Sequence, residues 1–213
     1  MCEVSKITRQ SAHKVVARRE KPDRNKLYRI AEQQAGYFTS GQAAEVGFDR
    51  KLLWHYQKTG QILRAAYAIY RLAHFPASPY EDLFIAWLQC GPRAAISHES
   101  ALALYNLSDV LPAEVHVTVP RTASRRRKGI RQHTNRLRPS AVRKREGLPV
   151  TSVQRTISDV AKAGLGEEQI REAIQQAVER GLTDRTSLLA EAKRRGGRAG
   201  RLIGKYTAEE TPD

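Results

Sequence analysis

The chain has 213 residues, two cysteines and a formal net charge of +15 at pH 7. This length can bury two small cores, and two cysteines are too few for a disulfide framework or a cysteine-based zinc site. Without an apolar run of about 18 residues or a signal-peptide core, membrane-spanning and secreted proteins are excluded, and we expect a cytoplasmic protein with no metal. The positive charge indicates a polyanionic partner.

Residues 1–24 are polar and mostly basic, which predicts a flexible arm. Such an arm either touches DNA phosphates or is an inert tail, and the two alternatives are equally compatible with its composition. Asn25 is positioned to cap a helix that carries Leu27, Ile30 and Ala31 at helical spacing and ends by Gly36.

A second, short helix is predicted after this one. Thr39 or Ser40 can cap it through a hydroxyl group, and Ala43 and Ala44 are expected to fill its buried side. Gly47 then permits a tight turn, as in a helix–turn–helix pair.

The third helix carries the main functional prediction. Asp49 caps it, and a step of about 100° per residue places Leu52, Leu53 and Tyr56 on one arc facing the core. The opposite arc is cationic with two aromatic rings, and its members are Arg50, Lys51, Trp54, His55 and Lys58. A helix of this size and charge suits a DNA major groove, whereas the alternative is a solvated face of a helical bundle.

Residues 62–65 and 69–72 read as two short strands, which would make a hairpin after the helix–turn–helix pair. Its turn, residues 66–68, contains no Gly, Asn or Asp to supply a positive φ. Together these elements predict a winged helix-turn-helix domain over residues 25–75. The DNA-binding residues expected from it are Thr39, Ser40, Gln42, Arg50, Lys51, Trp54, His55, Lys58, Arg64 and Arg71.

A domain boundary is predicted at residues 74–79, which hold two prolines. Residues 1–80 carry 14 basic and 6 acidic side chains, whereas residues 81–120 carry 1 and 5. The positive charge is therefore segmental, and a second domain is expected over residues 79–213.

The second domain is predicted to be a mixed α/β domain with a small sheet and C-terminal helices, so the chain is α+β overall. A helix around Phe84 ends at Gly91, and Ser97 caps the next. Strands are expected at residues 115–119 (half-buried), 130–137 and 148–150. Thr151 with Gln154 forms a candidate capping box, residues 170–178 form an amphipathic helix, a helix at 187–195 follows, and the last residues are expected to fray.

Residues 121–147 contain 11 basic residues and one acidic residue. This segment is either a surface for an anionic partner, which could be DNA, RNA or an acidic protein face, or a solvated loop. Its candidate surface residues are Arg121, Arg125, Arg126, Arg127, Lys128 and Arg131.

Catalytic motifs are weak. Ser97, His98 and Glu99 are consecutive, so on a helix they point about 100° apart and cannot form a triad. Ser97 is better read as a cap and His98 as a surface or interdomain contact. The chain contains no HExxH, paired Cys–His, P-loop or kinase motif.

Several longer sequence motifs resemble those of a known protein family. They are GYFTSGQAAEVGFDRKLL, YRLAHFP, SPYEDLFIAWL, ISHESALALYNLSD, TVPRTASRRR and GLPVTSVQRTISD. They are similar to the AbiEi antitoxins of type IV toxin–antitoxin systems, over roughly Leu27 to the helices after Asp159. The resemblance implies a winged helix that represses its own operon, and from the cationic helix face we expect it to bind duplex DNA with inverted repeats. It also implies a second domain that antagonises a nucleotidyltransferase toxin, without necessarily forming a stable complex. The chain departs from the family where a Gly is usual before the YRL strand, since Ile69 stands there.

Two alternatives remain open beside a DNA-binding antitoxin, which needs no cofactor. One is an ATP-dependent phosphotransferase acting on the toxin, with Asp159 near Arg155 or Arg126 as its weak catalytic candidates. A structural ion pair between Arg155 and Asp159, four residues apart, explains that spacing equally well. The other is an RNA-binding module, although few aromatic residues accompany the basic segment.

Overall fold

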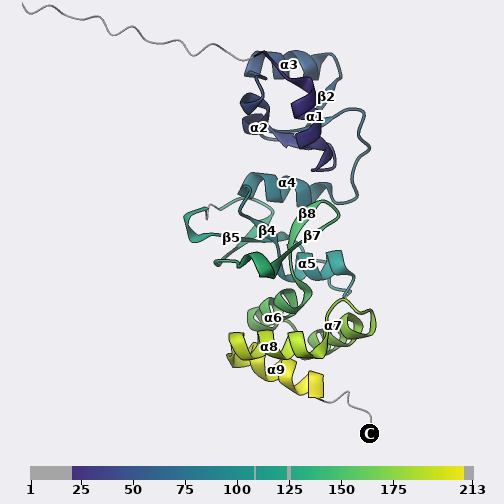
Figure 1. The fold of residues 1–213 in the computed structure, drawn as a ribbon, viewed down its shortest axis with the longest axis vertical. Coiled ribbons are helices and arrows are strands. Elements are labelled where there is room, and N and C mark those ends of the chain that lie inside the picture. The colour runs from purple at the N-terminus through teal and green to yellow at the C-terminus, as the bar shows by residue number, and fades with distance from the viewer. Residues whose placement is uncertain (1–20, 108, 124–125, 209–213) are drawn as a thin grey trace, which may run out of the picture.

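The computed structural model describes residues 21–107, 109–123 and 126–208. It is a mixed α+β structure in which a unit of three helices and a small sheet lies at one end (Figure 1). A second sheet occupies the middle and the C-terminal helices the other end. Residues 1–20 of the predicted arm lie outside the described residues. Within the described ranges, no helix is both long and apolar enough to cross a membrane.

The N-terminal unit contains six elements: the five that the sequence predicts, in the predicted order, and one additional strand, β1. They are α1 (Arg24–Glu32), β1 (Tyr37–Thr39), α2 (Ser40–Glu45), α3 (Arg50–Lys58), β2 (Ile62–Ala66) and β3 (Ile69–Leu72). The strands form an antiparallel sheet in the order β1-β3-β2. The cap of α1 is Asp23 rather than the predicted Asn25, because the Asp23 side chain accepts a 2.9 Å hydrogen bond from the Lys26 N–H.

The core of this unit explains why α2 and α3 pack as they do. Phe38 and Phe48 are almost completely buried, and Leu53 and Tyr56 of α3 close over them. The prediction that Ala44 is buried was wrong. The six-residue α2 buries only Ala43 among its side chains, and Ala44 faces solvent.

The hairpin β2–β3 forms where the sequence predicts it. Ala68 adopts the left-handed conformation with φ 58°, so the turn closes without a Gly, Asn or Asp. A register shift between Arg64 and Ala66 marks a bulge. A three-residue strand, β1, was missed by the sequence, and it makes β3 the central strand of the sheet.

The second sheet has the order β6-β5-β4-β8-β7, in which β5–β6 and β4–β8 are parallel and the other neighbours antiparallel. Its strands are β4 (Ala95–Ile96), β5 (Val115–Val119), β6 (Ile130–Thr134), β7 (Val142–Arg145) and β8 (Leu148–Thr151). Short 3-10 turns, η1 and η2, lie at Arg121–Ala123 and Pro139–Ala141.

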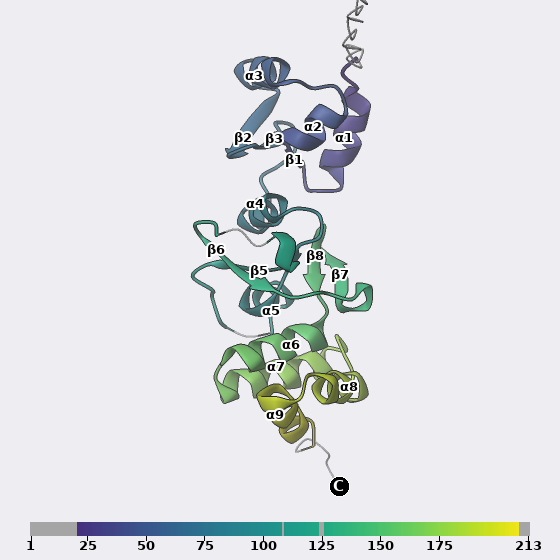
Figure 2. The same cartoon turned by 90° about the vertical axis from the view of Figure 1, so that its left-hand side faces the viewer.

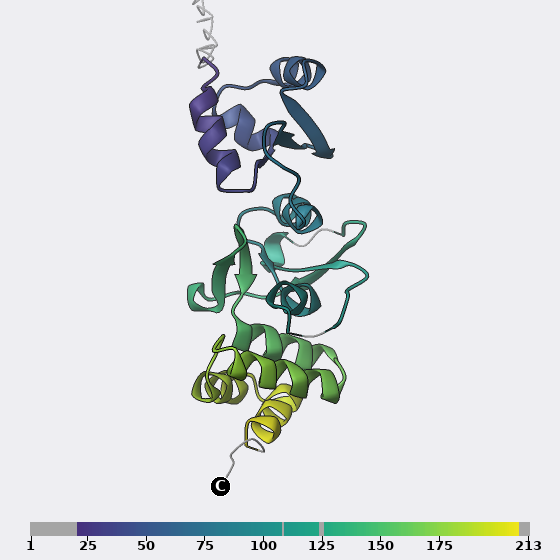
Figure 3. The ribbon, with the colours of Figure 1, turned by 90° about the vertical axis from the view of Figure 1, so that its right-hand side faces the viewer.

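Helices surround this sheet. They are α4 (Glu81–Cys90), α5 (His98–Tyr105), α6 (Val153–Ala163), α7 (Glu167–Glu179), α8 (Arg185–Arg195) and α9 (Gly197–Ala208). Helix α4 lies between the sheet and the N-terminal unit, as Figure 2 shows. Helices α6 and α7 lie side by side beyond α5, with α8 and α9 outside them (Figure 3).

Three sequence predictions for this half were wrong. β5 is buried on both faces rather than half-buried, because helices cover the sheet and His116 and Thr118 are buried with the valines. Thr151 is not a capping residue. It lies in β8, where its hydroxyl is 2.7 Å from that of Thr156. Residues 197–208, part of the end that was expected to fray, form α9, which buries Leu202 and Ile203 against the core, and residues 209–213 lie outside the described residues.

The two halves share apolar contacts. Tyr37 and Ile69 of the N-terminal sheet belong to the same hydrophobic cluster as Phe84 of α4. The Tyr37 and Phe84 rings stack with their centroids 5.5 Å apart. The first sheet therefore rests on α4.

Candidate functional site

The outward face of α3 is the first candidate site. Asp49 fixes the start of the helix by accepting a 2.9 Å hydrogen bond from the Leu52 N–H. Leu53 and Tyr56 are buried, and Leu52 is partly buried. All five predicted outward residues are exposed: Arg50, Lys51, Trp54, His55 and Lys58.

Two features of this face suit an anionic partner. Trp54 is 61% exposed, which is unusual for so large an apolar ring. The Lys58 Nζ lies 5.8 Å from the Trp54 ring centroid, within the range of a cation–π contact. This pairing places an aromatic surface and a positive charge together on one exposed patch.

Thr39 and Gln42 are placed less favourably for DNA contacts. Thr39 Oγ1 accepts from the Gln42 N–H at 3.1 Å, and Gln42 Oε1 accepts from the Thr39 N–H at 2.9 Å. This reciprocal capping box uses both side chains, and Gln42 also pairs with Gln34. Ser40, the first residue of α2, is partly exposed.

The hairpin separates its two predicted arginines. Arg64 on β2 is exposed, whereas Arg71 on the central β3 is partly buried and donates to the Phe75 carbonyl. Tyr67 at the hairpin tip is 82% exposed, and sequence reasoning missed it. Its position in the predicted turn was the available signal.

The basic segment 121–147 is not one loop, since β6 and β7 lie within it. Arg121, Arg126, Lys128 and Arg131 are exposed. Arg127 is partly buried and forms a bridge with Ile130 at the start of β6. Arg125 lies outside the described residues.

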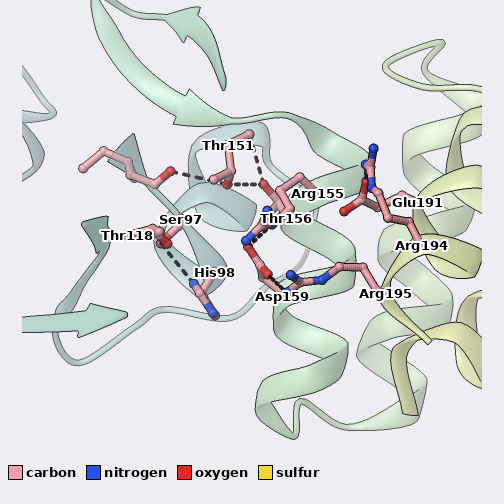
Figure 4. A network of polar contacts seen from close by, with 11 residues as sticks. Ser97, His98, Thr118, Thr151, Arg155, Thr156, Asp159, Glu191, Arg194 and Arg195 are labelled. Atoms are coloured by element: carbon pink, nitrogen blue, oxygen red, sulfur yellow. Dashed lines mark hydrogen bonds and ion pairs between the residues drawn. The ribbon is translucent and has the colours of Figure 1, made fainter. Parts of the chain in front are cut away.

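A buried charge network lies where α6 meets α8 (Figure 4). Asp159, 3% exposed, accepts from Arg155 Nε at 2.7 Å, and Arg195 contacts its other carboxylate oxygen. The predicted Arg155–Asp159 pair therefore exists, but Arg126 does not line the cavity beside it. Because each Asp159 oxygen is held by an arginine, the carboxylate is placed as an ion-pair partner rather than as a free base.

Two adjoining cavities, of about 440 and 400 Å³, border this network and share Asn135, Arg155 and Arg195. We call them together the arginine cleft. Its cationic lining residues are Arg136, Arg138, Arg143, Arg155, Lys162, Arg194 and Arg195, and its acidic ones are Asp159 and Glu191. Sequence reasoning missed most of these. The available signals were the basic segment 121–147, which contains Arg136, Arg138 and Arg143, and the run of basic residues that ends the predicted 187–195 helix.

Three histidines line or adjoin the far end of the cleft. His98 and His133 stack with ring centroids 3.5 Å apart, and His116 lies 5.2 Å from His133. Burial lowers the pKa of His98 to about 2 and the pKa values of His116 and His133 to about 4, so all three rings are neutral at pH 7. Among the described residues no group of His, Cys, Asp and Glu is arranged to hold a metal ion.

The prediction that His98 is a surface or interdomain contact was wrong, because its side chain is buried. Ser97 Oγ accepts from Thr118 at 2.8 Å and lies 3.0 Å from His98 Nδ1. Ser97 stands at the N-cap position of α5 but makes no capping bond with its side chain. His98 also has a φ of 52°, a strained conformation for a non-glycine residue that the surrounding contacts hold.

No protein-family model and no curated protein matches this sequence. Among solved structures, the chain is similar to the RV2827C protein from Mycobacterium tuberculosis, with a TM-score of 0.53 and 13% sequence identity. The similarity covers 89% of this chain and 78% of that protein. At this identity it supports the α+β fold alone.

Proposed function

We propose that the protein is the antitoxin of a type IV toxin–antitoxin system and represses its own operon. In this proposal, residues 25–75 are a winged helix-turn-helix that binds inverted repeats in duplex DNA. The second domain opposes a nucleotidyltransferase toxin. The observation that carries the DNA-binding part is the exposed cationic face of α3, directly followed by an exposed hairpin.

The physical argument for DNA is one of size and charge. A helix that buries one face and presents Arg50, Lys51 and Lys58 on the other can enter a major groove about 12 Å wide. Asp49 at its start and the packing of Leu53 and Tyr56 hold this helix rigidly on its unit. The hairpin then offers Arg64 and Tyr67 to the adjacent backbone or groove.

The antitoxin part rests on the sequence resemblance. Exposed Arg121, Arg126, Lys128 and Arg131 provide a basic surface, remote in sequence from α3, that suits an acidic face on the toxin. Neutralisation by this surface needs no cofactor and is compatible with a transient encounter.

The alternative is an enzyme that modifies the toxin, for example by ATP-dependent phosphorylation. Asp159 beside several arginines favours it, but both Asp159 oxygens are engaged in ion pairs. Incubating toxin with this protein and ATP, followed by intact-mass measurement, distinguishes the two, since only the enzyme produces a mass increase.

The test of the main proposal is binding to DNA from upstream of the protein's own operon, measured by fluorescence anisotropy over a range of salt concentrations. Each phosphate contact contributes roughly −0.9 to the slope of log K against log salt, so six contacts give about −5. A scrambled duplex of the same length should bind more weakly. Affinity that does not change with salt would exclude the proposed interface.

A further inference from the structure

We propose that the arginine cleft binds a nucleotide carrying two or more phosphates, with the phosphates at its arginine end and the nucleoside toward the histidines. This is a binding site in the second domain. This proposal goes beyond the recognition of operator DNA, and it does not depend on whether the N-terminal unit binds DNA.

The charge balance of the cleft is the first reason. Asp159 is held by both Arg155 and Arg195, so this buried group carries one more positive than negative charge. Burial and the nearby Arg155 lower the pKa of Arg195, which reflects the cost of crowding two guanidinium groups there. Arg194 pairs with the other acidic residue, buried Glu191.

Further cations line the same space without a lining carboxylate to balance them. Arg136, Arg138 and Arg143 come from the segment between β6 and the end of β7. An arginine guanidinium matches a phosphate in a bidentate geometry, and several around one space favour a ligand with more than one phosphate. A bound polyphosphate would offset this excess charge.

The start of α6 adds backbone donors. Ser152 stands at its N-cap position but makes no capping bond with its side chain, and Ser152, Gln154 and Arg155 all line the larger cavity. The first N–H groups of an 11-residue helix, aligned with its dipole, are a favourable anion site. Cationic side chains and a helix N-terminus thus meet in one cavity.

The two ends of the cleft differ, and this difference favours a nucleotide over a plain polyanion. The smaller cavity is lined by the neutral, stacked His98 and His133, and His133 Nε2 is buried with no hydrogen-bond partner. Such a nitrogen is satisfied when a ligand supplies a polar partner. Cavities of about 440 and 400 Å³ are in the size range of small-molecule sites.

The experiment uses the full chain and isothermal titration with ATP, GTP, inorganic tripolyphosphate and adenosine. We expect ATP or GTP to bind, tripolyphosphate to compete, and adenosine not to bind. Arg136→Ala/Arg138→Ala removes two exposed lining charges without disturbing the buried network, and should weaken nucleotide binding by about tenfold or more. The control Lys193→Ala/Arg201→Ala removes two exposed charges outside the cleft and should change it less than about twofold.

Three results would overturn the proposal. They are no nucleotide binding at millimolar concentration, equal weakening by the cleft and control variants, and tight binding of a single-stranded oligonucleotide that the cleft substitutions weaken but ATP does not displace. Operator binding should be unchanged in the Arg136→Ala/Arg138→Ala variant. A negative result for nucleotide binding would therefore leave the proposed DNA interface standing, and a negative result for operator binding would leave the nucleotide site standing.

Discussion

Tyr37 of β1 donates a 2.6 Å hydrogen bond to Glu81 at the start of α4, and so joins the N-terminal unit to the second domain. The Tyr37 ring is fully buried against Phe84. Burial, assisted by the Glu81 carboxylate, raises the pKa of Tyr37 to about 12, which indicates that the neutral phenol is the form the fold requires. This hydrogen bond adds a polar contact to the apolar packing of Tyr37 and Ile69 against Phe84.

Replacing this phenol tests how firmly the two halves are joined. Tyr37→Phe keeps the ring stacking but removes the hydrogen bond, so we expect a loss of about 1 kcal/mol in the free energy of unfolding. Urea denaturation at pH 7 measures this loss. Tyr67→Phe, at the exposed hairpin tip, is the matched control and should unfold like the original protein. Equal stability of all three proteins would show that the junction depends on apolar packing alone.

A substitution in the buried charge network should reduce the stability of the fold more than Tyr37→Phe does. Asp159→Asn removes the negative charge between Arg155 and Arg195 and leaves two partly or fully buried guanidinium groups facing each other. Breaking a buried ion pair from one side costs about 3–5 kcal/mol, so the melting temperature should fall steeply. Glu168→Gln, which breaks an exposed pair with Arg171, is the control and should melt nearly unchanged. A mild effect of Asp159→Asn would show that the carboxylate is not needed to hold Arg155 and Arg195 together.

The histidine group predicts a dependence of stability on pH. In the unfolded chain each histidine binds a proton near pH 6.5, whereas His116 and His133 in the fold stay neutral down to about pH 4. The unfolded state therefore binds more protons as the pH falls below about 6.5, and stability is lost progressively until about pH 4. Melting temperatures between about pH 7 and about pH 4.5 measure this slope.

His133→Gln identifies the source of that slope. The variant lacks one of the buried titrating rings, so its melting temperature should fall less between the same two pH values. His74→Gln, at an exposed position in the segment before α4, is the control and should retain the original slope. An identical slope in all three proteins would assign the acid sensitivity to other groups.

The sequence predicted the parts of this fold that local periodicity determines. Asp49 at a helix start, the buried spacing of Leu53 and Tyr56, and the repeat that forms α7 all act within a few residues. It missed β1, β4 and β7. Strands β1 and β4 have only three and two residues, too few to show a period, and β7, with the sequence VRKR, has no alternation of apolar and polar residues.

The same distinction applies to the sites. The ion pair between Arg155 and Asp159 could be predicted because one helical turn joins them, whereas Arg195 reaches Asp159 from 36 residues along the chain. The burial of His98 could not be predicted either, because it depends on β5 and β6 packing beside α5. Sequence alone therefore predicted the face of α3 well and the arginine cleft hardly at all.

Operator recognition can be tested on α3 itself. Arg50→Ala/Lys51→Ala removes two exposed charges on the side of the helix away from Leu53 and Tyr56, so the fold should be retained. A base contact contributes about 1–3 kcal/mol, and we expect operator affinity and repression of a reporter to fall accordingly. The control Lys193→Ala/Arg201→Ala carries the same change in net charge. If both variants repress equally, the recognition surface is not α3.

Toxin neutralisation should depend on a different surface. Arg126, Lys128 and Arg131 are exposed, so replacing all three by Ala removes charge with little change in melting temperature. If this surface meets an acidic face of the toxin, the triple variant should lose protection of toxin-producing cells while still repressing the operon. The Arg50→Ala/Lys51→Ala variant, produced at the same level from an independent promoter, should behave in the opposite way, protecting cells but failing to repress. Protection by the triple variant equal to that of the original protein would show that this segment is an ordinary solvated surface, and the arginine cleft would be the next site to test for neutralisation.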